Sequence, residues 1–259
     1  MKGITDTHCH LNDASLLGKI GSIIERSLNA GVHNFIVPAY DIESLEVTYK
    51  IANKYKNVYP AYGIHPWYIN ESFDLNNLRD YLADPRTIAV GEIGLDYADD
   101  VKIPRDLQMK VFISQVELAI EYNLPVLIHC RRAHLDMINA LRPYGDRIKG
   151  VMHSYSGSKE MINDFLALNL YLSFSGAVTR THAKKYHRSA LFVPLDRILF
   201  ETDAPSISTQ TVAAKDVEPH HIWEIIDFVA GLRKMDKEIL VRASMENVDR
   251  LFDGRIESG

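Results

Sequence analysis

Four histidines and two carboxylates stand where short apolar runs of the sequence end. His8 and His10 close the run GITDTHCH at 3–10. Side chains two residues apart in an extended segment leave the same face, so both imidazoles can reach one metal ion. The remaining candidates end later runs and are Glu92, His129, His153 and Asp203. An apolar strand gains nothing from a buried, unpaired imidazole or carboxylate, so we predict that these six side chains form a metal centre.

Six ligands are more than one catalytic zinc ion takes, since such an ion usually has three protein ligands and an open position. We therefore expect two divalent metal ions, about 3.5 to 4 Å apart as in other two-metal sites. The expected allocation gives one ion His8, His10 and Asp203, gives the other His129 and His153, and makes Glu92 the bridge. Taken singly, His129 or His153 fits a hydrogen-bonded core residue equally well, so the prediction depends on their convergence.

The elements that must position these residues repeat along the chain. Eight short, apolar, β-branched runs occur at 3–10, 33–39, 57–64, 87–93, 125–130, 150–154, 170–176 and 197–203. Amphipathic stretches such as 17–31 and 106–123 lie between them, and 220–234 and 237–252 follow the last run. The alternation predicts an α/β fold, a (β/α)8 TIM barrel, whose usual length is about 250 residues.

An open, doubly wound sheet is the alternative to the barrel. Such a sheet usually carries a Gly-rich phosphate loop after its first strand, where this chain reads THCHLND. In a barrel, active sites are built at the carboxyl ends of the strands. The six candidate ligands share that position, so the barrel brings them together.

Composition limits the protein class. The chain has 259 residues, 46% of them hydrophobic and 24% charged, without a linker or repeat, so we expect a single domain over 1–259. A formal net charge of -5 argues against a general basic surface for coating nucleic acid. No apolar run is long enough for a membrane span, and the start MKGITDTHCH has no secretion signal. Cys9 and Cys130 form no CxxC pair, and we expect both to be packing residues in a reduced, cytoplasmic protein with no membrane and no obligatory protein partner.

The strings DTHCH, GIHPW, GEIGLDY, LPVLIHCR, MHSYSG and ETDAP occur in this order. Together they resemble the TatD-like metal-dependent hydrolases, a branch of the amidohydrolase-type barrels, from Ile4 to about Phe252. The resemblance implies a TIM barrel with a one- or two-metal centre that hydrolyses phosphodiesters, usually described as DNase activity, with zinc, magnesium or manganese as metal. The family's ligand positions fall on the same six residues.

The resemblance also places His65 of GIHPW and Arg131 near the scissile phosphate. His65 can donate a hydrogen bond to a phosphoryl oxygen, and Arg131 offers a planar fork to the same group. Two positions depart from the common pattern: Arg132 stands in place of an acidic residue, and Val217 precedes Glu218-Pro219 where the family reads Asn-Glu-Pro. We expect both departures to border the substrate mouth.

The predicted mechanism uses a metal-activated water with Asp203 as general base. Asp6 and Glu201 each precede a predicted ligand by two residues, so each either holds a ligand imidazole by its second nitrogen or fills a polar layer of the barrel. The segment with Arg180, Lys184, Lys185 and Arg188 either steers a phosphate backbone or is a solvated helix face.

Three functions stay open at this point. The first is a phosphodiesterase or deoxyribonuclease acting on DNA or another phosphodiester. The second is a barrel hydrolase of a small-molecule ester or amide. The third is a catalytically idle nucleic-acid-binding protein, which the costly set of six polar residues at strand ends argues against.

Overall fold

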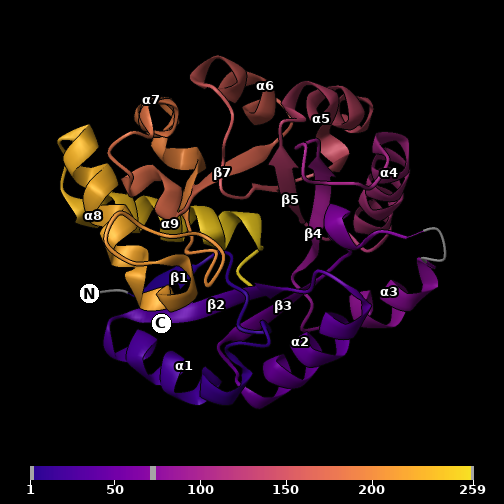
Figure 1. Cartoon of the computed structure of the whole chain (residues 1–259), viewed down its shortest axis with the longest axis horizontal. Coiled ribbons are helices and arrows are strands. Elements are labelled where there is room, and N and C mark those ends of the chain that lie inside the picture. Colours follow the sequence, from indigo (N-terminus) through magenta and orange to yellow (C-terminus); the bar gives the residue numbers. More distant parts are fainter. Residues whose placement is uncertain (1–2, 71–73, 258–259) are drawn as a thin grey trace.

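Eight parallel strands form one sheet in the order β1 to β8, each hydrogen-bonded to the next along the chain, in the computed structural model (Figure 1). The structure describes residues 3–70 and 74–257. The strands are β1 (Ile4–Asp6), β2 (Val32–Pro38), β3 (Val58–Tyr62), β4 (Ala89–Asp96), β5 (Val126–Arg131), β6 (Gly150–Met152), β7 (Leu170–Phe174) and β8 (Ile198–Phe200). The predicted (β/α)8 barrel is confirmed.

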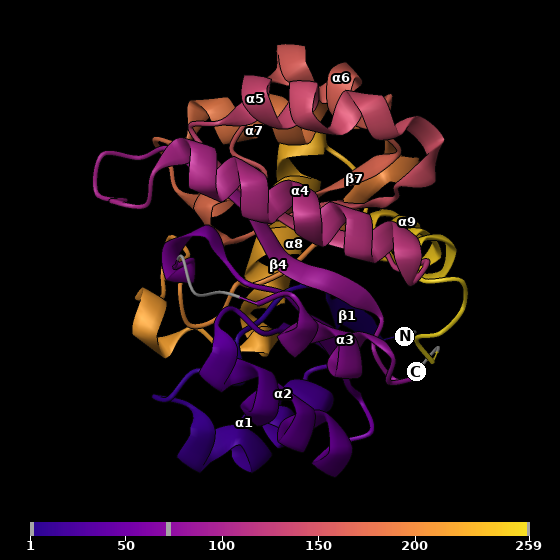
Figure 2. The ribbon, with the colours of Figure 1, turned by 90° about the vertical axis from the view of Figure 1, so that its right-hand side faces the viewer.

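Helices surround the sheet, with α1 and α2 on the opposite side of the molecule from α5 and α6 (Figure 2). They are α1 (Ile20–Asn29), α2 (Ile42–Lys54), α3 (Asn76–Leu82), α4 (Arg105–Glu121), α5 (His134–Leu141), α6 (Ile162–Leu166), α7 (Lys184–Phe192), α8 (Ile222–Arg233) and α9 (Lys237–Leu251). Helix α2 begins with a capping box, in which the Asp41 side chain accepts from the Ser44 backbone N–H and the Ser44 hydroxyl accepts from the Asp41 N–H. No helix among the described residues is both long enough and apolar enough to cross a membrane.

Alternation along the strands separates two apolar layers. One face packs against the helices, and both Cys9 and Cys130 lie in that layer, as predicted. The other face fills the barrel interior with Leu127, Val151 and Leu199 among others, together with residues of α9. Side chains two residues apart share a face of a strand. His129 therefore follows Leu127 on the interior face, and His153 follows Val151 on the same face.

The ends of the sheet order are joined by the segments that follow β1 and β8. No ladder pairs β8 with β1 within 3–70 and 74–257. Instead the Thr7 N–H donates to the Phe200 carbonyl at 3.2 Å, the Asp203 N–H to the His8 carbonyl at 2.8 Å, and the His10 N–H to the Ala204 carbonyl at 2.7 Å. These bonds close the barrel beside the candidate ligands.

Strand β4 runs four residues beyond Glu92, which the sequence pattern placed at the strand's end. The pairing with β5 passes from Val90–Val126 to Ile93–Ile128, so two residues of β4 face one residue of β5. This is a β-bulge, which changes the direction of the bulged side chains. A Cβ at Gly91 would lie 2.6 Å from the Leu127 Cβ, so glycine permits the close approach that the bulge requires.

Candidate metal centre

The carboxyl ends of the strands surround a cavity of about 380 Å³. Five of the six side chains predicted as ligands line it: His10, Glu92, His129, His153 and Asp203. The sixth, His8, is fully buried next to them. The structure therefore brings together all six residues, although they come from five different strand regions of the chain.

Glu92 lies at the centre of the cluster, and its two carboxylate oxygens face different histidines. The Oε2 atom is 3.2 Å from His8 Nε2 and 3.5 Å from His10 Nε2. The Oε1 atom is 3.0 Å from His129 Nδ1 and 2.9 Å from His153 Nε2. This is the division of ligand atoms that a bridge between two ions requires.

Asp203 faces the first pair of histidines. Its Oδ1 atom is 3.7 Å from His8 Nε2 and 3.3 Å from His10 Nε2. That oxygen is buried without a hydrogen-bond partner. Burying an unpartnered carboxylate oxygen is costly, and a cation is the partner that this oxygen lacks. The donor set of imidazole nitrogens and carboxylate oxygens thus fits divalent metal ions.

Titration of the cluster shows the same need for positive charge. Burial by itself would raise the pKa of Glu92, but the neighbouring imidazoles, led by His153 and His65, hold it well below its usual range. Burial opposes a charge on His10, yet Asp203 and Glu92 raise its pKa to about 10. Positive charge on His10 therefore balances the buried carboxylates, and a cation bound among these side chains would supply the same balance.

Two carboxylates outside the cluster fix the orientation of two imidazoles. Asp96 Oδ2 lies 3.0 Å from His129 Nε2, and Glu201 Oε1 lies 3.2 Å from His153 Nδ1. An acceptor at one ring nitrogen keeps the proton there and leaves the other nitrogen's lone pair free. His129 therefore presents Nδ1 to Glu92, and His153 presents Nε2. The role predicted for Glu201 is confirmed in this geometry.

The corresponding prediction for Asp6 is wrong. The chain bends at Thr7 and His8, directly after β1, and the pairing of β1 with β2 is irregular at Ile4 and Thr5, so the faces do not alternate regularly from Asp6 to His8. The carboxylate instead accepts the backbone N–H of His8 at 3.2 Å and both the N–H and the hydroxyl of Thr202. The second nitrogen of His8, Nδ1, has no hydrogen-bond partner. Burial raises the pKa of Asp6 to about 8, against these hydrogen bonds.

His65 lies inside the cluster. It caps the 3-10 turn Pro66–Tyr68, where its Nδ1 accepts the Trp67 backbone N–H at 3.2 Å. Its Nε2 atom is 3.5 Å from Glu92 Oε1. Burial lowers the pKa of His65 well below its usual value, so the ring is neutral. With Nδ1 as acceptor, the single proton is on Nε2, which makes His65 a hydrogen-bond donor toward the centre.

Arg131 stands at the mouth of the cavity and is partly committed to other groups. Its Nε donates to Asp96 at 2.9 Å, its Nη2 donates to Asp100 at 2.6 Å, and the guanidinium lies 5.5 Å from the centre of the Trp67 ring. Asp96 also accepts the Trp67 indole N–H at 2.7 Å. The buried Asp96 carboxylate therefore connects His129 with Arg131 and Trp67 at the mouth. The sequence alone did not predict this connection.

Neither of the two departures from the family pattern lines the cavity. Arg132, expected to border the mouth, is exposed and pairs with Asp99 at 2.6 Å. Val217, for which the same was expected, is buried in the apolar layer outside the sheet, and its neighbour Glu218 binds Arg26 of α1.

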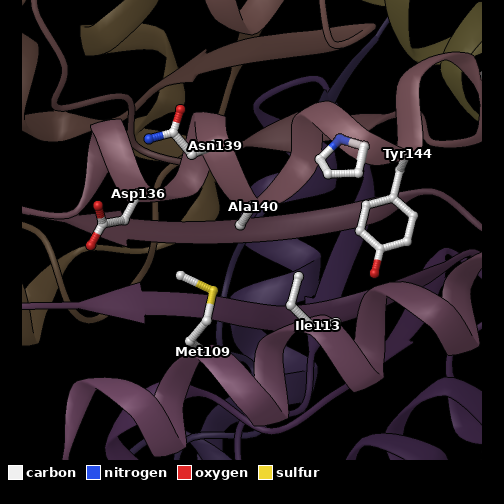
Figure 3. A pocket seen from close by; sticks show the side chains of 7 residues that line it. Met109, Ile113, Asp136, Asn139, Ala140 and Tyr144 are labelled. Atoms are coloured by element: carbon white, nitrogen blue, oxygen red, sulfur yellow. The ribbon is translucent and has the colours of Figure 1, made fainter.

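A separate groove of about 330 Å³ lies between α4 and the α5 region, away from the cluster (Figure 3). Met109 and Ile113 of α4 face Ala140 and Tyr144 across it (Figure 3). Its lining includes one carboxylate, Asp136, and no histidine. The groove therefore lacks the cluster of imidazoles and carboxylates that a metal centre requires.

Comparison with known proteins supports the geometry. The family model described as TatD related DNase matches residues 5–253. A protein of Bacillus subtilis (strain 168) called uncharacterized metal-dependent hydrolase YabD is 34% identical over 250 residues, which is 95% of this chain and 98% of that protein. A protein of Shigella flexneri serotype 5b, called 3'-5' ssDNA/RNA exonuclease TatD, is 28% identical over 89% of this chain and 91% of its own length.

A solved structure gives the same fold. The crystal structure of YjjV, a TatD homologue from Escherichia coli K12, superposes with a TM-score of 0.90 at 30% identity. The match covers 96% of this chain and 98% of the other. The similarity therefore extends over the whole barrel, and the residues that the family model matches include all six of the cluster.

Proposed function

Since the chain belongs to the TatD-related DNase family and is a metal-dependent hydrolase, we propose that it hydrolyses phosphodiester bonds of DNA at a centre of two divalent metal ions. The observation that carries the proposal is the division of the Glu92 carboxylate, with Oε2 toward His8 and His10 and Oε1 toward His129 and His153. One ion would take the first pair with Asp203, and the other would take the second pair. The exonuclease name of the Shigella relative supports a nucleic acid as substrate.

Bound divalent ions would supply Lewis-acid charge for the phosphoryl oxygens and a water acidic enough to react at neutral pH. Asp203 would accept the proton of that water. Burial alone would raise the pKa of Asp203, but the neighbouring imidazoles of His10 and His8 hold it below its usual value. The carboxylate is therefore ionised at neutral pH and ready to act as a base.

His65 and Arg131 would hold the substrate. The His65 Nε2–H points toward Glu92 and can donate to a phosphoryl oxygen placed above the centre. Arg131 contributes a positive charge at the mouth, and Asp96 and Asp100 fix its position. Both interactions strengthen as charge accumulates on the phosphoryl group in the transition state.

The test combines metal quantification with a substrate panel. Elemental analysis of purified protein reconstituted with zinc, manganese or magnesium should give two ions per chain. Under the same conditions, bis(p-nitrophenyl) phosphate and single-stranded DNA should be cleaved, and chelator should stop both reactions.

The variant His129→Ala should lower both the metal content and the rate, because it removes a predicted ligand. Cleavage of p-nitrophenyl acetate without any phosphodiester cleavage would favour an ester hydrolase. Tight DNA binding without hydrolysis under any metal would favour an idle binding protein. Either result would refute the proposed function.

A further inference from the structure

The chain carries a basic surface on one side of the cavity mouth. Between Asp164 and Asp196 the sequence contains no acidic residue and four basic ones, although the net charge of the chain is -5. The four are Arg180, Lys184, Lys185 and Arg188, which we call the α7 basic surface. All four are exposed, and none of them makes an ion pair within 4.0 Å among the residues that the structure describes.

The positions of these charges oppose the stability of helix α7. Lys184 and Lys185 occupy its first turn, which contains no acidic residue, and its N-cap residue Ala183 makes no side-chain cap hydrogen bond. Cations at a helix N-terminus are repelled by the helix dipole. Arg188 lies three residues after Lys185 and four after Lys184, so it adds like-charge repulsion on the same helix face. Helix formation therefore does not explain this arrangement.

The surface adjoins the cavity at both of its ends. Tyr186 of α7 lines the cavity itself. Arg180 donates to the Ser208 hydroxyl at 2.9 Å, in the loop whose residues Ser206 and Ile207 also line the cavity. At the other end, Lys185 acts electrostatically on His134, whose Nε2 is 3.3 Å from the hydroxyl of Ser156, a residue that lines the cavity. In Figure 1, α7 lies on the rim between α6 and α8.

We propose that the α7 basic surface binds the phosphates of a single DNA strand that flank the scissile bond. The proposal rests on the proposed function, because the cavity would hold the reacting phosphodiester while α7 holds the neighbouring ones. A strand with regularly spaced negative charges complements several unpaired cations on one rim, whereas a small monoanionic ester touches only the cavity. The surface would therefore act on the affinity for long substrates and not on the chemical step.

The experiment compares two triple variants that change the net charge equally. The first is Lys184→Gln/Lys185→Gln/Arg188→Gln. The control is Lys50→Gln/Lys54→Gln/Lys56→Gln, which removes three exposed charges from α2 and the residues just after it. Binding is measured in the metal-loaded protein by fluorescence anisotropy of a labelled phosphorothioate oligothymidylate, which keeps its charges and resists cleavage, over a series of salt concentrations.

We expect the α7 variant to bind the oligonucleotide about tenfold or more weakly at low salt, and its slope of log K against log salt to fall by about 2, since three phosphate contacts are lost. The control should stay within about twofold of the unmodified chain. Hydrolysis of bis(p-nitrophenyl) phosphate should be unchanged in both. Equal losses in the two variants, no loss in the α7 variant, or no binding by the unmodified chain would each overturn the proposal.

The two proposals fail in different ways. Failure of the unmodified chain to cleave bis(p-nitrophenyl) phosphate or DNA refutes the phosphodiesterase function, whereas the anisotropy measurement decides the α7 surface without any bond being broken. Cleavage of both substrates with equal oligonucleotide affinity in all three proteins refutes only the α7 surface.

Discussion

Replacing Asp96 with asparagine should weaken metal binding without disturbing the barrel. In the native chain, Asp96 Oδ2 accepts from His129 and Trp67, and Oδ1 accepts from Arg131 and the Ala98 N–H. Burial would raise the pKa of Asp96, but the hydrogen bonds from His129 and Arg131 hold it well below its usual range, so the group is an acceptor only. An asparagine replaces one of these two acceptor oxygens with an NH₂ group, which is a donor. Whichever way the amide is turned, its NH₂ group faces two donors and cannot accept from either of them.

The consequence for His129 follows from its two nitrogens. If the amide nitrogen of the introduced asparagine faces Nε2, that ring nitrogen must become the acceptor, and the proton moves to Nδ1, which faces Glu92. A protonated Nδ1 cannot bind a metal. Changes of this kind outside the ligand set usually cost about 10- to 100-fold in metal affinity or activity, or about 1.4 to 2.7 kcal/mol.

The measurement is a competition titration of zinc or manganese against a chromophoric chelator, followed by kcat/KM for bis(p-nitrophenyl) phosphate. Asp100→Asn is the matched control, because Asp100 also binds Arg131 but does not touch His129. The control should retain native metal affinity. Native affinity and turnover in Asp96→Asn, within about threefold, would show that the orientation of His129 does not depend on this carboxylate.

Three further predictions concern stability. Chelation should lower the melting temperature and added metal should raise it in a concentration-dependent way, since a ligand of the folded state stabilises that state; a melting temperature insensitive to metal would contradict the cluster's role. Gly94→Ala should lower the free energy of unfolding by about 3 kcal/mol or more in urea denaturation, because the new Cβ would lie 1.9 Å from the His129 carbonyl oxygen at a φ of +153°. In the control Gly231→Ala in α8, the new Cβ meets nothing within 4 Å, so the free energy of unfolding should rise by about 0.5 to 1 kcal/mol. Burial lowers the pKa of His134 from 6.5 to about 4, so between these pH values the unfolded chain binds more protons than the folded chain. The free energy of unfolding should therefore fall as the pH falls from about 6.5 to 4. His134→Gln should flatten this part of the curve of stability against pH.

Periodicity predicted most of the architecture because the different faces of each helix and strand have different surroundings, which leaves a regular pattern of residue types in the sequence. The segment expected at 106–123 is helix α4 at Arg105–Glu121, and that expected at 237–252 is α9 at Lys237–Leu251. The strands were harder to delimit. The run at 3–10 has only Ile4–Asp6 in regular pairing. Thr7 and His8 form a bend, and the backbone of 7–10 is bonded to β8, to the segment after β8 and to β2.

The clustering of the six side chains could be predicted because strand ends converge in a barrel, whereas the contacts around the cluster could not. The pairing of Asp96 with His129 depends on the bulge that begins at Gly91, and a bulge changes which face a side chain takes. The glycines at 91 and 94 were the available signal, since each stands where β4 approaches β5 too closely for a Cβ. The resemblance placed His65 near the scissile phosphate, but its contact with Glu92 could not be predicted, because it depends on the turn in which His65 is the capping residue.

The bonds that close the barrel link residues from opposite ends of the polypeptide, since Asp203 binds the His8 carbonyl and His10 binds that of Ala204. Asp203 is the last of the six residues to be synthesised, at position 203 of 259. Any shorter nascent fragment lacks this carboxylate and the bonds that close the barrel. Completion of the six-residue cluster therefore coincides with closure of the ring of strands.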